Sequence, residues 1–203
     1  MAAEPGRQIP AVNQTLTLRG LLEMKSTLAA LLLATTSIVA HADTPPATNE
    51  PIDALDLGRY KGTWYEIAKY PDWNERHCAA DVSTELSGSD PRKLSIVTRC
   101  VDDDGAAVEK TGVLRQLGNR DSAMLEKSYA PTWLSLVPAS WSDYWVIDID
   151  AGYTLAAVSE AGRGHLWILS RTRKIDPQTY AQLLQRLQKQ GFDTDKLVAT
   201  EQD

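Results

Sequence analysis

Alternating apolar and polar positions dominate the chain after about its first sixty residues. Short runs with a period of two recur, and this period is typical of β-strands with one buried face. The runs are residues 63–70, 80–86, 94–101, 107–117, 123–129, 144–149, 153–158 and 165–170. Turn residues such as Gly118-Asn119 separate them. Eight closely spaced strands without intervening helices predict an all-β fold, either an up-and-down antiparallel barrel or a sandwich.

A single helix is predicted after the last of these strands. Asp176 suits the N-cap, Pro177 suits the first helical position, and Gly191 is placed to end the helix. The apolar stripe between them consists of Tyr180, Leu183, Leu184 and Leu187. We expect this stripe to pack on the outside of the sheet, with Leu197-Val198 adding a last short strand.

An apolar run near the start of the chain shows neither period. It follows Met24-Lys25 and ends in Ala40-His41-Ala42, whose small residues suit cleavage between Ala42 and Asp43. The run is too short to cross a hydrocarbon core of about 30 Å as a helix. We therefore interpret residues 24–42 as a secretory signal peptide, with a buried core helix as the alternative.

This interpretation divides the chain into four parts. Residues 1–23 become an upstream extension, residues 43–56 an exposed leader rich in Pro, Thr and acids, and residues 57–203 one folded domain. No Cys follows the apolar run, so the thiol that a lipoprotein signal acylates is absent. We expect a periplasmic or secreted product, with outer-membrane association as a further alternative.

The two cysteines of the chain, Cys78 and Cys100, both belong to the folded part. An oxidising compartment favours a disulfide between them. Folding the predicted hairpin about its turn at residues 88–91 also brings them close to opposite each other. The alternatives are a metal pair or a reactive thiol. A metal site needs more His or Cys ligands nearby, and only His77 qualifies.

Charge and motifs exclude several classes of function. The net charge is −6 and no block of basic residues occurs, which argues against nucleic acid as a partner. The sequence contains no Gly-x-Ser-x-Gly elbow, His-Glu-x-x-His helix or glycine-rich phosphate loop. Of its three histidines only His165 falls in a predicted strand. We therefore expect neither an enzyme nor a bound metal or cofactor.

Three motifs resemble the signatures of the lipocalin family. They are Gly62-Thr63-Trp64-Tyr65-Glu66-Ile67-Ala68, Ser142-Asp143-Tyr144 and Leu166-Trp167-Ile168-Leu169-Ser170-Arg171-Thr172. They occur in the family's order and at about its distances, and the predicted helix follows them. The residues of these motifs are similar to those of the bacterial outer-membrane lipocalins, a branch related to apolipoprotein D. The resemblance covers residues 57–203 and implies a closed eight-stranded antiparallel barrel with one C-terminal helix on its outside.

The resemblance also implies a structural lock at one end of the barrel. In the family, the indole of the first motif closes that end and the Arg after the last strand stacks across it. Here these residues are Trp64 and Arg171. A guanidinium over a desolvated indole is worth about 2 kcal/mol. Gly62 is expected where the chain turns too tightly for a side chain.

Alternation from these residues predicts the interior of the barrel. Counting from Trp64 places Glu66, Ala68 and Tyr70 inward, and counting back from Arg171 places Leu169, Trp167 and His165 inward. On the strand at 144–149, Tyr144, Val146 and Asp148 share a face, opposite the apolar set Trp145, Ile147 and Ile149. The predicted ligand contacts are Tyr144, Trp167, Val146, Leu169, Glu66, Tyr70 and His165. Ordinary barrel core is the alternative for the apolar members, and the inward acids serve either a ligand or the fold.

An eight-stranded barrel encloses space for one small ligand. The resemblance implies binding, storage or transport of a hydrophobic ligand, a fatty acid or lysophospholipid, in the bacterial cell envelope. The protein is expected to act as a monomer or homodimer. The alternatives are a lipocalin-fold enzyme and a tetrapyrrole-binding protein that uses His165 or a Tyr.

The apolar segment at residues 129–141 interrupts the alternation and contains two prolines. We interpret it as a loop at the open mouth of the barrel, with Trp133 and Trp141 exposed or half-exposed. Such a loop touches a membrane surface transiently or caps the ligand. The alternative is that its apolar side chains pack on the barrel's own rim.

Overall fold

The computed structural model describes residues 48–71 and 78–203 of the chain. The signal peptide expected at residues 24–42, its cleavage between Ala42 and Asp43, and the upstream extension lie outside these residues, as does His77. In the described part, no helix is long and apolar enough to cross a membrane.

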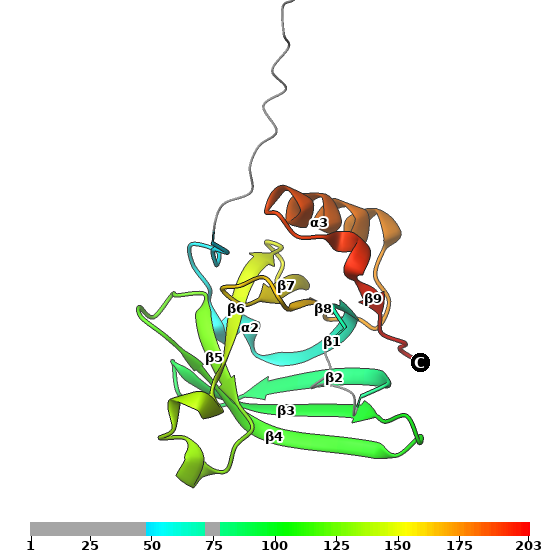
Figure 1. Ribbon diagram of the computed structural model, residues 1–203. Helices are drawn as coiled ribbons and strands as arrows, with labels where there is room; N and C mark the ends of the chain where they lie inside the picture. The colour runs from blue at the N-terminus through cyan, green and yellow to red at the C-terminus, as the bar shows by residue number, and fades with distance from the viewer. Residues whose placement is uncertain (1–47, 72–77) are drawn as a thin grey trace, which may run out of the picture. The chain divides into compact units, whose positions relative to one another are not determined.

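Eight antiparallel strands of the described part form a closed barrel (Figure 1). They are β1 (Gly62–Lys69), β2 (Ala80–Ser87), β3 (Lys93–Val101), β4 (Ala107–Gln116), β5 (Met124–Ser128), β6 (Ser142–Ile149), β7 (Leu155–Ser159) and β8 (Leu166–Ser170). Each strand pairs with the next, and β1 pairs with both β2 and β8, which closes the barrel. The predicted strands are thus confirmed to within two residues at every end, and the barrel replaces the sandwich alternative.

A helix and a short strand follow β8. Helix α3 (Pro177–Lys189) begins after Asp176, whose carboxylate accepts a hydrogen bond of 2.8 Å from the Thr179 N–H, and Gly191 follows its end with φ of +90°. Strand β9 (Val198–Ala199) then pairs with the end of β1. The predicted helix and last strand are therefore confirmed.

The residues after β9 complete the wall between β1 and β2. These two strands pair only from Gly62 to Tyr65 of β1. Beyond that point the Gln202 Nε2 donates to the backbone oxygens of Glu66 (2.9 Å) and Val82 (3.0 Å), one on each strand. Glu201 also forms an isolated parallel bridge with Ala80. The C-terminal segment therefore closes the seam that the two strands leave open.

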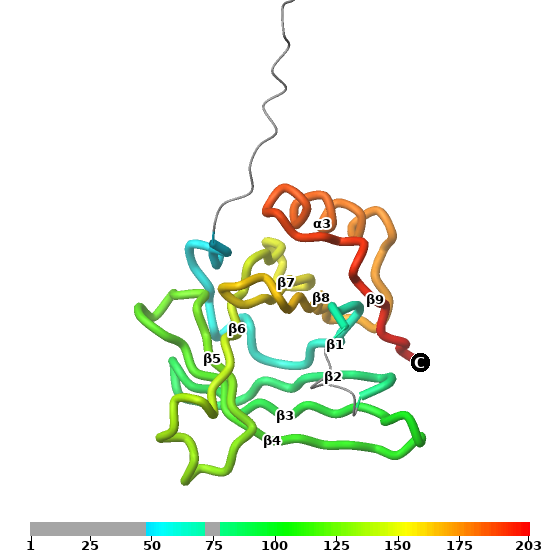
Figure 2. Tube along the Cα trace, viewed as in Figure 1, coloured from blue at the N-terminus to red at the C-terminus, as the bar shows by residue number. Residues whose placement is uncertain are grey.

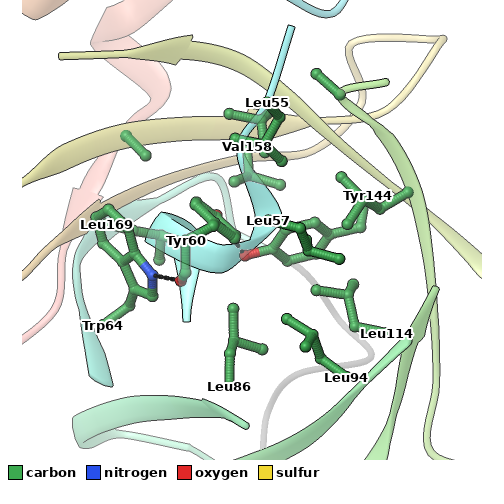
Figure 3. Close-up of a cluster of buried hydrophobic side chains, with 14 of the residues drawn as sticks. Leu55, Leu57, Tyr60, Trp64, Leu86, Leu94, Leu114, Tyr144, Val158 and Leu169 are labelled. Atoms are coloured by element: carbon green, nitrogen blue, oxygen red, sulfur yellow. Dashed lines mark hydrogen bonds between the residues drawn. The ribbon is translucent and has the colours of Figure 1, made fainter. Parts of the chain in front are cut away.

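Apolar side chains gather in two clusters, one inside the barrel and one beneath α3. The inner cluster includes Trp64, Leu86, Leu94, Leu114, Leu125, Tyr144, Val146, Val158, Trp167 and Leu169, several of which are shown in Figure 3. The outer cluster joins Leu183 and Leu187 of α3 to side chains of β1, β6, β7 and β8. Both faces of β7 and β8 are therefore covered, and all ten of their residues are buried.

An irregularity in β1 reverses its alternation. The pairing with β8 shifts between Glu66 and Ala68, as it does at a β-bulge, where one extra residue changes which face the following side chains occupy. Ala68 and Tyr70 consequently lie in the outer cluster, and the Tyr70 hydroxyl donates to the Asp193 carbonyl at 2.9 Å. The predicted inward orientation of Ala68 and Tyr70 is wrong, because strict alternation ignores the bulge.

Strand β6 carries a second such irregularity, between Val146 and Asp148. Asp148 lies outside the barrel and accepts two hydrogen bonds, of 2.7 and 2.8 Å, from the Arg186 guanidinium of α3. Ile149 packs against the inner cluster instead. The prediction that Asp148 faces inward and Ile149 outward is therefore wrong for the same reason, and Asp148 anchors the helix.

The chain before α2 (Leu57–Tyr60) lies against the barrel, alongside β6 (Figure 2). The Ile52 N–H donates to the Val146 carbonyl at 2.9 Å, and the Leu55 N–H donates to the Asp121 carbonyl at 2.7 Å. Asn49 is buried, and Leu55 is 0% exposed within the inner cluster. The expectation of an exposed leader is thus wrong for this part of residues 43–56, because Leu55 supplies an apolar side chain to the end of the barrel.

Candidate ligand-binding site

One end of the barrel is sealed around Trp64. The Arg171 guanidinium carbon lies 3.8 Å from the centre of the Trp64 ring, and the indole N–H donates to the Tyr60 carbonyl at 2.9 Å (Figure 3). Gly62 has φ of +97°, and a side chain there would bring its Cβ to 3.2 Å from an Arg171 nitrogen. The contact between Trp64 and Arg171 expected of a lock is thus present, and Gly62 leaves room for it.

Arg171 also holds together the backbone at this end. Its guanidinium donates to the carbonyl oxygens of Thr63 (2.9 Å), Arg59 (3.0 Å), Lys61 (2.8 Å) and Tyr153 (3.2 Å). Two of these carbonyls belong to α2 or to the turn into β1, one belongs to β1 itself, and one belongs to the β6–β7 turn. A single side chain therefore ties the entrance of β1 to the neighbouring turn.

Two tyrosines form the floor above this seal. The hydroxyls of Tyr60 and Tyr144 lie 2.9 Å apart, and both side chains are buried among leucines of the inner cluster. Burial raises the pKa of both hydroxyls, since the charged phenolate is disfavoured away from water. The pair therefore stays neutral, and in their hydrogen bond one hydroxyl donates and the other accepts.

The other half of the barrel contains a cavity of about 600 Å³, within the usual range for small-ligand sites. Among the predicted contacts, Tyr144, Trp167, Leu169, Glu66 and His165 line it. Val146 is fully buried in the inner cluster but does not belong to the lining, and Tyr70 lies beneath α3. Alternation along the sequence therefore identified most of the lining residues of β1, β6 and β8. It did not show that the cavity ends above Val146.

One wall of the cavity is aromatic. The rings of His165 and Trp167 stack with centroids 5.5 Å apart and an angle of 7° between their planes. Tyr144 and Leu169 continue this wall toward the floor. Flat apolar faces of this kind suit an acyl chain or another flat apolar group.

The opposite wall is lined by hydroxyls, which the sequence analysis missed. The Thr98 hydroxyl lies 3.2 Å from that of Thr84 and 2.7 Å from that of Tyr129, so the three form a chain across β2, β3 and the end of β5. All three residues line the cavity. Alternation along the strands could have predicted the two threonines. Thr84 lies two residues before the inward Leu86, and Thr98 lies two residues after the inward Ile96.

Charged side chains also line the cavity, and most were missed. Lys69 Nζ lies 3.4 Å from a carboxylate oxygen of Glu66, which also accepts a hydrogen bond of 2.7 Å from the Thr200 hydroxyl. Lys127 Nζ lies 4.3 Å from the centre of the Trp167 ring. Glu66 is thus held by the fold through Lys69 and Thr200, and the cavity combines apolar, hydroxyl and charged surfaces. Such a mixture suits an amphiphile better than a pure hydrocarbon.

The loop between β5 and β6 borders the cavity. It contains two short 3₁₀ helices, Thr132–Leu134 and Pro138–Ser140. Trp141 is half-buried in the lining, and the centre of its ring lies 3.7 Å from the guanidinium carbon of Arg115. By contrast, Trp133 is 75% exposed and Leu136 is 90% exposed. The predicted position of this loop at the mouth, with an exposed and a half-exposed Trp, agrees with the structure.

Cys78 and Cys100 form a disulfide, with their Cα atoms 5.4 Å apart. The predicted pairing is confirmed. Cys78 belongs to the cavity lining, so the bond fixes the segment before β2 against β3 at the side of the cavity. Across residues 48–71 and 78–203, no cysteine is free and no group of three or more His, Cys, Asp or Glu side chains is arranged to hold a metal ion.

Sequence comparisons match residues 55–202 to a family model described as a lipocalin-like domain. The chain is similar to temperature-induced lipocalin-1 of Arabidopsis thaliana, with 30% identity over 154 residues, or 75% of this chain and 82% of that protein. It is also similar to outer membrane lipoprotein Blc of Citrobacter freundii, with 30% identity over 175 residues, or 86% of this chain and 94% of that protein.

Solved structures agree with the fold. The insecticyanin of the tobacco hornworm Manduca sexta superposes with a TM-score of 0.59 and 18% identity, covering 78% of this chain and 86% of that one. At this identity the likeness shows the barrel architecture alone.

Proposed function

The chain belongs to the lipocalin family, and from this premise we propose that it binds and carries a single-chain amphiphile, a fatty acid or a lysophospholipid, in the bacterial cell envelope. The cavity beside Trp167 carries this proposal. It is sealed at the end that holds Trp64 and Arg171 and bordered at the other by an exposed apolar loop. A ligand would therefore enter at the end with the loop, and the sealed end would limit how far it can be inserted.

Transfer of an acyl chain from water supplies the affinity. Each CH₂ group buried against the wall of Trp167, Tyr144 and Leu169 contributes about 0.8 kcal/mol, less the cost of ordering the ligand. The hydroxyl and charged surfaces of the same cavity suit a polar head group. The mixture of surfaces supports an amphiphile as the cargo.

We propose binding without catalysis. Members of the family bind small hydrophobic ligands, and two carboxylates of this cavity, those of Glu66 and Glu160, are held by groups of the fold. The Glu160 carboxylate accepts hydrogen bonds from the backbone N–H groups of Gly162 (2.9 Å) and Gly164 (2.5 Å). Cys78 is oxidised to a disulfide, which removes the thiolate that an acyl-transfer reaction would use.

Native mass spectrometry of protein purified from the periplasm, with lipid analysis of a solvent extract, tests the proposal. We expect a mature chain that starts at Asp43 and about one single-chain lipid per protein. An empty protein that also takes up no added fatty acid or lysophospholipid would refute the carrier role. A visible absorption band would instead support the tetrapyrrole alternative.

Replacing Trp167 by alanine is expected to weaken binding of a fatty acid about tenfold, or about 1.4 kcal/mol. The substitution removes the large flat face of the cavity wall, together with its stacking on His165. Displacement of a fluorescent fatty acid measures the change. Trp133→Ala is the matched control, because that indole is exposed outside the cavity and its loss should leave affinity unchanged. Parent-like affinity in Trp167→Ala would contradict the site assignment.

We also propose that the loop between β5 and β6 touches lipid surfaces when the ligand is exchanged. Exposed Trp and Leu side chains beside the mouth are typical of such contacts. The double variant Trp133→Ser/Leu136→Ser should lose at least half of the co-sedimentation that the parent shows with phosphatidylcholine vesicles. Val198→Ser changes an exposed apolar residue of β9 and serves as the control. Equal co-sedimentation of parent and double variant would count against this contact.

A further inference from the structure

The wall between β1 and β2 contains an inserted segment, residues 197–203, which we call the strap (red in Figure 1). Its first part includes β9, which pairs with the mouth end of β1. On its other side, Glu201 forms a parallel bridge with Ala80, and the Glu201 carbonyl accepts the Asp81 N–H at 2.8 Å. The strap therefore joins the mouth ends of two strands that pair directly with each other only near the sealed end.

The seam that the strap fills borders the cavity. Glu66 and Lys69 of β1 and Val82 of β2 line the cavity beside it. The Thr200 hydroxyl of the strap donates to the Glu66 carboxylate at 2.7 Å, so the strap contacts a lining side chain directly. Neighbouring strands lie about 4.8 Å apart, so removing an inserted strand leaves its two neighbours about 10 Å apart. A gap of this width at the seam would open straight into the cavity.

Both strands beside the seam are held from their far sides. Strand β1 pairs with β8 as far as Lys69, which stands opposite Trp167. Strand β2 pairs with β3 as far as Ala80, and the disulfide from Cys78 to Cys100 fixes the residues before it. The strap can therefore leave the seam while the rest of the barrel wall keeps its pairing.

The strap itself is held with little apolar burial. Leu197 packs against the outer cluster, but none of residues 198–203 is buried, and Val198 is 55% exposed. The side chain of Gln202 donates across the seam, yet its Oε1 is buried and has no hydrogen-bond partner among the described residues. Part of the cost of desolvating this amide is therefore not recovered. A segment with so few apolar contacts opens locally at a lower free energy than the core of the barrel.

An exposed ion pair closes the strap against β2. The Arg173 guanidinium donates to the Asp81 carboxylate at 2.6 Å and to the Asp203 carbonyl at 2.7 Å, and we call these contacts the clasp. The side chains of Arg173 and Asp81 are 45% and 25% exposed, and ion pairs in contact with water are weak. Asp81 also has φ of +53°, in the left-handed region that a residue other than glycine rarely adopts. The clasp therefore holds the strap by contacts that water can replace.

We propose that the strap is a side gate of the cavity. Residues 198–203 move away from the wall about Leu197, and the acyl chain of the ligand passes between β1 and β2 with its length along the seam. The gate rests on the proposed function and adds the route of the cargo. Since the seam begins at the mouth, opening the strap lengthens the entrance, and the chain need not be threaded end first past the β5–β6 loop. Opening breaks the bond from Thr200 to Glu66, whose carboxylate retains Lys69 Nζ, 3.4 Å away, as an ionic partner.

A disulfide across the seam tests the gate by preventing its opening. Ala80→Cys/Glu201→Cys joins two bridge partners, whose spacing of about 4.8 Å suits a disulfide. In the oxidised variant, we expect the association and dissociation rate constants of cis-parinaric acid, a fluorescent fatty acid, to fall together by about tenfold. The dissociation constant should stay within about twofold of the parent's, because a blocked route slows entry and exit equally. Stopped-flow fluorescence measures the rates, and peptide mass mapping checks that the Cys78–Cys100 bond is intact.

Val97→Cys/Thr111→Cys is the matched control, since these residues are paired on β3 and β4, away from the strap. Its oxidised form should exchange the ligand at the parent's rates. Parent-like rates in the oxidised Ala80→Cys/Glu201→Cys variant would overturn the gate. Slower dissociation alone, with tighter binding, would mean that the strap is a fixed wall and would also overturn it. If the parent took up neither cis-parinaric acid nor a lysophospholipid, the proposed function itself would fail, and the gate with it.

Releasing the clasp tests the gate in the opposite direction. Arg173→Met should raise both rate constants about threefold, since the strap then opens more often, and should leave the dissociation constant unchanged. Arg99→Met is the matched control, because Arg99 is similarly exposed and bonds Glu85 and Glu109 on the outer face of the sheet, away from the strap. Equal exchange rates in Arg173→Met, Arg99→Met and the parent would overturn the gate.

Amide hydrogen exchange tests the opening without any ligand, so its result does not depend on the proposed function. The amides of Asp81 and Thr200 bond on the two sides of the strap and should exchange at least about tenfold faster than those of β3. In the oxidised Ala80→Cys/Glu201→Cys variant, both should slow toward the rates of β3. If these two amides exchange in the parent as slowly as those of β3, the strap does not open and the gate is overturned.

Discussion

Replacing Trp64 by alanine is expected to lower the free energy of unfolding by about 4 kcal/mol, the usual cost of truncating a buried Trp. The side chain is 1% exposed, donates to the Tyr60 carbonyl and lies beneath the Arg171 guanidinium. Its removal leaves a cavity at the sealed end and a charged group without its aromatic partner. Urea denaturation of the parent and the variant measures the difference.

A double-mutant cycle with Arg171→Met isolates the contact between the two side chains. We expect a coupling energy of about 1–2 kcal/mol, since the guanidinium is partly desolvated over the ring. Trp133→Ala, an exposed Trp, should change stability by less than about 0.5 kcal/mol. If Trp64→Ala unfolds at the same urea concentration as Trp133→Ala, the role of Trp64 as a structural lock is refuted.

The double variant Cys78→Ala/Cys100→Ala is expected to lose about 3 kcal/mol of stability. The disulfide joins residues 22 apart in the chain, and restricting a loop of that length in the unfolded state has an effect of this size. Reducing the parent should lower its stability by a similar amount, whereas the same reductant should not affect the variant. Unfolding transitions that coincide for the oxidised parent, the reduced parent and the variant would contradict the prediction.

The barrel could be predicted because its signal is repeated in every strand. Alternation, turn residues and the three motifs all indicated eight strands and a helix, and the structure has them within two residues of the expected ends. The β-bulges were not predictable in this way. One extra residue at Glu66–Ala68 or Val146–Asp148 leaves the composition of the strand unchanged but moves the following side chains to the other face. Tyr70 and Asp148 were misplaced for that reason.

The polar half of the site was harder to predict than its aromatic half. Trp167 and Tyr144 belong to recognisable motifs, whereas Lys127 and Thr98 occur among the polar residues of ordinary strands. A lysine on a strand is usually exposed, and only the pairing of Lys127 with Leu114 reveals that it faces inward. Leu55 was missed in a similar way, because the short segment with Ile52, Ala54, Leu55 and Leu57 shows no clear period of two.

The seam between β1 and β2 has a consequence for the order in which the molecule is made. Strand β1 is synthesised early, yet its partners β8 and β9 follow roughly a hundred residues later, and Gln202 bridges it to β2. Because these contacts join distant parts of the polypeptide, their formation is slow compared with that of a local hairpin. A nascent chain shorter than about residue 202 has an incomplete wall. The wall of the cavity is therefore completed only after the segment that carries Gln202 has been added.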